Sequence, residues 1–192
     1  GYGDGDRDTL EEKTVDWLGI PIDRDDDKLS AAGNATVHTI RDLHSGCSLA
    51  VPLREHGQEA MYRNFKFFAG LKAKAPNILV RSDAAREITN AVRELGWRAE
   101  PSLENKWPHN AAHERYQGVL KSVTRAGMLQ SGFPRKAWDL CISYCSVALA
   151  ATQLAPIHSW EKDAAGNVLD AHKYKINQTC WTVFHEGAVF EL

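Results

Sequence analysis

Residues 79–88 read LVRSDAAREI and are the most informative ten positions of the chain. The apolar run that leads into them, Asn77 to Val80, is typical of a buried strand, and Asp83 follows within three residues. The segment from Ala84 to Leu95 has helical composition, and Gly96 is placed to cap its carboxyl end. A strand that runs into a helix, with a carboxylate at the junction, indicates an α/β protein with its chemistry near strand ends.

Strand and helix signals alternate on both sides of this unit. The segments before it are predicted as strands Thr14–Ile20, Thr36–Ile40 and Cys47–Leu53, followed by helix Gln58–Leu71. The segments after it are predicted as strand Trp97–Ala99 and helices Ala111–Met128 and Pro134–Gln153. This order predicts a mixed α/β sheet that starts with antiparallel strands and is flanked by helices.

The 192 residues divide into three predicted regions. Residues 1–13 are rich in glycine and acidic side chains, and we expect them to be flexible. Residues 14–153 carry the predicted strands and helices and match the usual domain size of about 150 residues. Residues 154–192 mix Gly, Asn and Pro too irregularly to assign, so we predict an extension of unclear structure.

The charge balance restricts the partners of this chain. Lys and Arg total 23 against 25 for Asp and Glu, which gives a net charge of −2. Such a chain has no overall positive field, so any polyanion must be met by a local patch. The sequence has no apolar signal region and no apolar run long enough to cross a bilayer. We therefore expect no membrane partner and an intracellular protein of the nucleus or cytoplasm.

Carboxylates at the predicted strand ends are the main candidates for chemistry. Asp16 lies in the first strand, Asp83 follows the buried strand, and Glu114 lies on the polar face of a helix. Two aspartates and one helical glutamate can converge on a pair of Mg²⁺ ions, which prefer hard oxygen ligands and serve phosphoryl transfer.

Three stretches around Asp83 and Glu114 resemble integrase motifs. Residues 79–88 are similar to the integrase strand that runs into Ser/Thr-Asp-Asn-Gly-x-Glu-Phe. Residues 107–115, WPHNAAHER, resemble the pattern Pro/Thr-x-x-Asn-Gly-x-Ala-Glu-Arg. Residues 120–138 resemble the stretch with Leu-x-x-x-x-Arg-x-Met-Leu, then Gly-Leu-Pro and a tryptophan. From Thr14 to Ala150 the chain resembles the catalytic core of a retroviral or copia-type retrotransposon integrase.

The resemblance implies a fold and a metal site. The fold is ribonuclease-H-like, with a mixed five-stranded sheet of three antiparallel and then two parallel strands, flanked by helices. Asp83 matches the second metal-binding aspartate of the family, and Glu114 matches the metal-binding glutamate, with 30 residues between them. Asp16 matches the first metal ligand, with Asp23 as the alternative. Asp42 matches a family aspartate that does not bind metal.

The resemblance also implies an activity and partners. Mg²⁺ or Mn²⁺ would support endonucleolytic processing of the 3′ ends of an element's DNA and their transfer into target DNA. Lys121 and Arg125, on the face of Glu114, would neutralise DNA phosphates, and Asn110 would cap the helix or touch DNA. A homo-oligomer and an origin in a retrotransposon polyprotein are also implied.

Three alanines depart from the family pattern. Ala84 and Ala85 replace the Asn-Gly after the second aspartate, and Ala111 replaces the glycine after Asn110. Alanine restricts the backbone more than glycine does, which leaves the mobility of the site open. Two alternatives therefore stand beside the active integrase. The first is a decayed or domesticated domain that binds nucleic acid or protein without catalysis, and the second is a nuclease that cuts RNA in hybrids.

Overall fold

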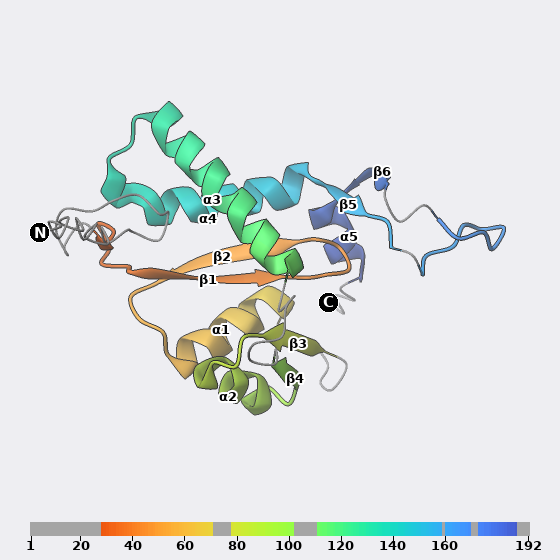
Figure 1. The fold of residues 1–192 in the computed structure, drawn as a ribbon, viewed down its shortest axis with the longest axis horizontal. Coiled ribbons are helices and arrows are strands. Elements are labelled where there is room, and N and C mark those ends of the chain that lie inside the picture. Colours follow the sequence, from red (N-terminus) through yellow and green to blue (C-terminus); the bar gives the residue numbers. More distant parts are fainter. Residues whose placement is uncertain (1–27, 71–77, 102–110, 159, 170–172, 188–192) are drawn as a thin grey trace, which may run out of the picture.

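The computed structural model describes residues 28–70, 78–101, 111–158, 160–169 and 173–187. A hairpin of two antiparallel strands, β1 (Thr36–Arg41) and β2 (Ser48–Leu53), runs through the middle of the molecule (Figure 1). Helices α3 (Ala111–Ser131) and α4 (Trp138–Thr152) cover one face of the hairpin, and α1 (Gln58–Ala69) covers the other. A short 3₁₀ turn, η2 (Arg135–Ala137), precedes α4, so the regular helix starts later than the predicted Pro134.

β1 separates two apolar cores because successive side chains of a strand point to opposite faces. Val37 points to the first core, where it joins side chains of β2, α3 and α4: Ala50, Tyr116, Leu120, Met128, Trp138, Ile142 and Cys145. Ile40 points to the second core, which also holds Met61, Phe65, Ala91, Val92 and Trp97. Because both faces of β1 are buried, the side chains that this strand contributes to the candidate site have fixed positions.

The unit around Asp83 has the predicted order of strand, helix and strand, but its first strand is not buried as expected, since Leu79 is 46% exposed. β3 (Leu79–Ser82) and β4 (Arg98–Pro101) are parallel neighbours, and α2 (Arg86–Glu94) connects them. Gly96 ends the helix with a positive φ of 72°, and its N–H donates to the carbonyl of Arg93 at 3.0 Å. Glycine adopts this left-handed conformation without a steric penalty, which confirms the predicted cap.

The predicted five-stranded sheet is wrong for the described residues. Their strands form three separate two-stranded sheets, β1 with β2, β3 with β4, and a third pair near the carboxyl end. A continuous sheet needs every strand hydrogen-bonded to its neighbour. The strand predicted at 14–20 lies outside the described residues. The described sheets are therefore only the antiparallel pair, the parallel pair and the pair near the carboxyl end.

The segment after α4 contains structure that the sequence left unassigned. β5 (Leu154–Pro156) pairs with β6 (Tyr174–Thr179), and α5 (Cys180–Gly187) follows directly. Cys180 packs with Cys47 and Ala150 in a third apolar cluster. Within the described part of the chain, no helix is long and apolar enough to cross a membrane.

Gly46 allows this segment to approach the β1–β2 turn. Its φ of 76° favours glycine, and a Cβ atom there would lie 3.1 Å from the Sγ of Cys180. The close contact joins the carboxy-terminal segment to the central hairpin.

Candidate active site

Asp83 and Glu114 lie at the ends of two different elements. Asp83 follows the last residue of β3, and its side chain is exposed. Glu114 is in the first turn of α3 and is exposed as well. Negative charge is favourable in the first turn of a helix, because the unpaired N–H groups there carry partial positive charge. Both carboxylates are therefore available to a ligand.

His113 precedes Glu114 in α3 and connects this helix to β1. The Nε2 atom of His113 lies 2.8 Å from the Oγ1 of Thr39. The side-chain amide of Gln117 donates to Thr39 Oγ1 at 2.9 Å and to His113 Nε2 at 3.2 Å. These contacts tie the first two turns of α3 to β1, and they fit a neutral ring whose Nε2 accepts a hydrogen bond.

The pKa of His113 responds to burial and to three charged side chains. Burial lowers the pKa of His113, and the positive charge of Arg41 lowers it further. The negative charges of Asp83 and Glu114 act in the opposite direction on the same pKa, but the net shift is downward. The ring is therefore neutral at physiological pH, in agreement with its hydrogen bonds.

Arg41 adds a cation to this neighbourhood. Its guanidinium lies over the ring of Tyr116, 5.0 Å from the centroid, and its Nη1 donates to the carbonyl of Ala112 at 3.4 Å. Its Nε is buried and has no hydrogen-bond partner among the described residues. A cation at the start of a helix suits a site that binds a phosphate.

Lys121 and Arg125 continue along α3 from Glu114. They follow it by about two and three helical turns, which corresponds to roughly 10 and 16 Å along the axis. Arg125 is exposed and Lys121 is half-buried. Their spacing is compatible with successive phosphates of a nucleic-acid strand that starts at the carboxylates.

Asp42 has a structural position in the β1–β2 turn. Its Oδ2 accepts hydrogen bonds from the backbone N–H of Ser45 at 2.7 Å and from the hydroxyl of the same residue. These bonds hold the turn, in keeping with the expectation that Asp42 does not bind metal.

Asp16, Asp23 and Asn110 lie outside the described residues. The choice between Asp16 and Asp23 as the first carboxylate stays a prediction, as does the role of Asn110. The two described carboxylates fit Mg²⁺ chemically, since they are exposed and supply hard oxygen atoms.

Sequence reasoning missed four residues of this neighbourhood: Thr39, Arg41, His113 and Gln117. Thr39 and Arg41 are two apart on a strand and share a face, while His113 and Gln117 are four apart on a helix and share a face. These spacings were visible in the sequence. The contact between the two elements was not, because it joins residues 74 positions apart.

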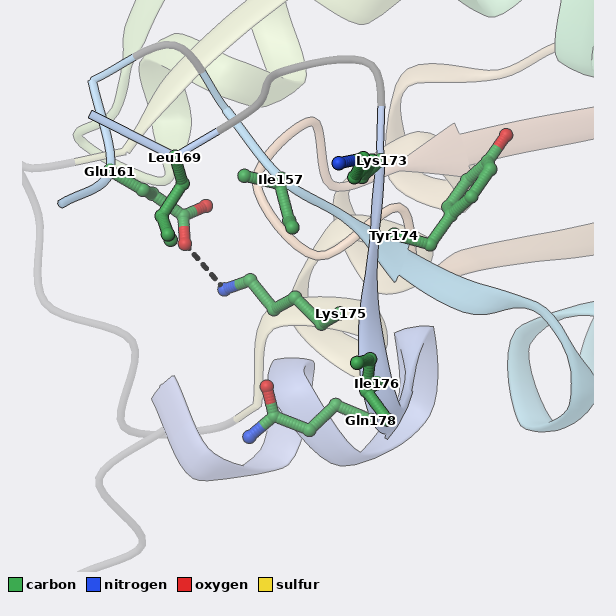
Figure 2. A pocket seen from close by; sticks show the side chains of 8 residues that line it. All are labelled: Ile157, Glu161, Leu169, Lys173, Tyr174, Lys175, Ile176 and Gln178. Atoms are coloured by element: carbon green, nitrogen blue, oxygen red, sulfur yellow. Dashed lines mark ion pairs between the residues drawn. The ribbon is translucent and has the colours of Figure 1, made fainter. Parts of the chain in front are cut away.

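A pocket of about 670 Å³ lies elsewhere, in the carboxy-terminal segment (Figure 2). The residues that line it come from β6 and from the chain after β5: Ile157, Glu161, Leu169, Lys173, Tyr174, Lys175, Ile176 and Gln178. None of the predicted site residues is among them.

The helices and strands define a mixed α/β domain with an antiparallel hairpin and a βαβ unit. Solved structures with a similar fold are integrases. The HTLV-2 integrase catalytic core domain, in complex with magnesium and in a dimeric form, matches with a TM-score of 0.51 and 14% identity, over 78% of this chain and 83% of that chain. The simian T-cell lymphotropic virus intasome, in complex with PP2A regulatory subunit B56 gamma, matches with a TM-score of 0.54 and 17% identity. That match covers 78% of this chain and 48% of the other.

No protein-family model matches the sequence, and no curated protein matches it. The structural matches show that the chain has the ribonuclease-H-like fold of retroviral integrase catalytic cores.

Proposed function

We propose that this protein is an integrase-type polynucleotidyl transferase that processes the 3′ ends of an element's DNA and joins them to target DNA. The observation that supports the proposal is the position of two exposed carboxylates, Asp83 directly after β3 and Glu114 in the first turn of α3, on a fold like that of integrase cores. The HTLV-2 domain was solved in complex with magnesium. The same cofactor, or Mn²⁺, suits the two carboxylates here.

Asp83 and Glu114 are the proposed metal ligands, with Asp16 as the third carboxylate. When bound, Mg²⁺ would polarise a phosphodiester and lower the pKa of a water molecule that it binds. The carboxylates offset the charge of the cation and leave its position fixed relative to β3 and α3.

His113 is proposed as a positioning residue for the first turn of α3. Thr39 on β1 and Gln117 one turn further along α3 hold its ring, so the backbone that carries Glu114 is tied to the buried strand. Arg41, whose guanidinium lies at the start of α3, is proposed to bind a phosphate. In a reaction where a 3′-hydroxyl attacks a phosphodiester, Arg41 would stabilise the extra negative charge.

The proposed partners are the DNA of the element ends, target DNA and a second copy of the chain. Lys121 and Arg125, with Asn110, are proposed to contact the DNA backbone. The titles of the matching structures describe a dimeric form and an intasome for those proteins. A retrotransposon polyprotein as the origin, and action in the nucleus or cytoplasm, follow from the same proposal.

The activity is tested with a branched oligonucleotide that mimics an element end joined to target DNA. The protein is incubated with it in Mg²⁺, and the resealed target strand is quantified on a gel. Asp83→Asn and Glu114→Gln should each lower the rate by at least about 100-fold, because each removes a metal ligand. Glu59→Gln is the matched control, since this exposed glutamate on α1 pairs with Arg63 at 3.1 Å and makes the same change of charge.

The two alternatives predict other outcomes of related assays. A decayed domain would show no strand transfer and no Mn²⁺ binding that depends on Asp83 and Glu114. A hybrid-cleaving nuclease would cut the RNA of an RNA–DNA hybrid faster than it processes DNA under the same metal condition. Activity unchanged by both carboxylate substitutions would rule out the proposed site.

A further inference from the structure

Two histidines and a glutamate meet where the carboxy-terminal segment touches the β1–β2 turn. His44 belongs to the turn, whereas His158 and Glu161 follow β5. A ring nitrogen of each histidine and a carboxylate oxygen of Glu161 all lie within 4.8 Å of one another. Ligand atoms of a tetrahedral zinc ion lie about 3.3 Å apart, given bonds of about 2.0 Å. Small rotations, above all of the exposed His44, would close the difference.

The hydrogen bonds of His158 prepare it as a metal ligand. Its Nε2 lies 2.7 Å from the backbone carbonyl of His44, and since a carbonyl only accepts, Nε2 donates. The neutral ring then keeps its lone pair on Nδ1. In a metal-bound histidine, the ring nitrogen that does not bind the metal usually donates a hydrogen bond to a carbonyl or carboxylate, which fixes the orientation of the ring.

Two aromatic rings restrict the orientation of His158. The indole of Trp160 stacks on its imidazole at 4.3 Å with an interplanar angle of 3°. The imidazole of His44 lies on it at 5.4 Å and 22°. A ring held in this way loses little further freedom when it binds an ion.

Glu161 is held in place by two hydrogen bonds. Lys175 donates to its Oε2 at 2.9 Å, as Figure 2 shows, and the backbone N–H of His158 donates to its Oε1 at 3.2 Å. Both side chains of the ion pair are less than one-fifth exposed, at 17% and 18%. Burial alone would raise the pKa of Glu161, but these hydrogen bonds lower it below its usual range. Each carboxylate oxygen has two lone pairs, so the anion can still bind a cation.

We propose that His44, His158 and Glu161 bind one zinc ion, which fastens the carboxy-terminal segment to the turn of the central hairpin. Two imidazoles and one carboxylate are ligands that suit Zn²⁺ and leave its fourth position open. Mg²⁺ prefers an all-oxygen environment, so this site and the site at Asp83 and Glu114 select different ions. The zinc site is independent of the proposed DNA activity.

Calorimetric titration of the full chain with Zn²⁺ tests the proposal, with excess Mg²⁺ present to compete at the carboxylates. Wild-type protein should bind one equivalent, and His44→Ala and Glu161→Gln should each weaken binding about ten-fold or more. His56→Ala is the matched control, because this exposed histidine lies at the opposite end of the hairpin, where its Nε2 contacts Thr36 at 2.9 Å. Asp83→Asn should also leave zinc binding unchanged.

Thermal unfolding gives a second readout. Zinc should raise the unfolding midpoint of the wild-type protein and of His56→Ala by the same amount, and that of His44→Ala by less. The proposal is overturned if wild-type protein binds no zinc, if His44→Ala and Glu161→Gln bind it as tightly as wild type, or if Asp83→Asn abolishes binding.

Discussion

At the residue scale, buried histidines lie on both faces of β1. His38 points toward α1, where it meets the ring of Phe65 edge-on at 5.1 Å and its Nδ1 accepts from the amide of Asn64 at 3.3 Å. His113 meets Thr39 on the other face. Burial, and then the charges of His113 and His56, lower the pKa of His38 from 6.5 to about 4. A neutral His38 is therefore part of the packed second core.

This shift predicts that the protein loses stability in mild acid. The unfolded chain binds a proton at His38 below pH 6.5, whereas the folded chain binds it only near pH 4. The free energy of unfolding should therefore fall by on the order of 3 kcal/mol as the pH drops through this window, and the loss should be complete below it. Urea unfolding at a series of pH values measures the effect.

His38→Asn should flatten this part of the pH profile, since asparagine keeps an acceptor near the position of Nδ1 and does not titrate. The exposed His44, whose charge is not among those that lower the pKa of His38, should leave the profile as steep as in wild type when it is substituted in the same way. Equal slopes in wild type and His38→Asn would contradict the assignment.

Single residues of the site were predictable to different degrees. Asp83 could be placed at a strand end because an apolar run precedes it, and Glu114 on an exposed helix face because the apolar positions lie elsewhere. The neutral state of His113 could not be predicted, because it depends on burial by a helix and a strand that are distant in sequence.

At the element scale, α4 closes the outer edge of the central hairpin. The hydroxyl of Ser146 accepts from the backbone N–H of Ala50 at 3.1 Å, and the hydroxyl of Ser143 donates to the carbonyl of Ala50 at 3.3 Å. Exposed strand edges pair with other strands, and a helix that bonds the edge prevents this. The two serines thus fix α4 on β2.

Ser146→Ala should destabilise the fold. The side chain is fully buried, so its loss leaves the N–H of Ala50 without a partner, at a cost of about 1–3 kcal/mol in the free energy of unfolding. Denaturant unfolding measures the change. Ser122→Ala should cost much less, because its exposed hydroxyl bonds only the carbonyl of Gly118 on its own helix. Equal losses in the two variants would show that the bond to β2 is unimportant.

The helices were easier to predict than their contacts. Periodicity located α3 and α4 to within a few residues, and a helical period over residues 111–128 also groups Val119 and Val123 with Tyr116 and Leu120 on the apolar face of α3. The two valines are 41% and 37% exposed, because α3 packs against its neighbours through a narrower stripe that includes Tyr116, Leu120 and Met128. Sequence periodicity shows which side chains are apolar, but the neighbouring elements determine which are covered.

At the scale of the whole molecule, α4 carries an uncovered apolar stripe. Leu140, Tyr144 and Val147 recur at helical spacing and are 74%, 75% and 44% exposed. The same helix buries Trp138 and Ile142 on its opposite side. The stripe supports the proposed homo-oligomer, since single apolar residues are common on surfaces but helical stripes mark interfaces.

Tyr144→Asp should weaken self-association about ten-fold or more, because it places a charge at the centre of the stripe. Light scattering on a dilution series measures the change in mass. Ile176→Asp, on the exposed β6, should leave the association constant unchanged. A wild-type protein that stays monomeric at high concentration would contradict the prediction.

For the whole molecule, the near-neutral charge is compatible with a DNA substrate. A net charge of −2 excludes a global attraction, so the proposed contacts of Arg41, Lys121 and Arg125 must act locally beside the carboxylates. The arrangement of the carboxy-terminal segment could not be predicted from the sequence. Its packing depends on the close approach of Cys180 to Gly46 and Cys47, which no periodic pattern indicates.

The central claim is that Asp83 and Glu114 act as one catalytic unit, and the resealing rate of the Asp83→Asn/Glu114→Gln double variant tests it most directly. Residues that serve one metal site are not additive, so the double variant should be no slower than the slower single variant. Losses that multiply would show that the two residues act separately. Single variants as active as wild-type protein would show that neither takes part in the reaction.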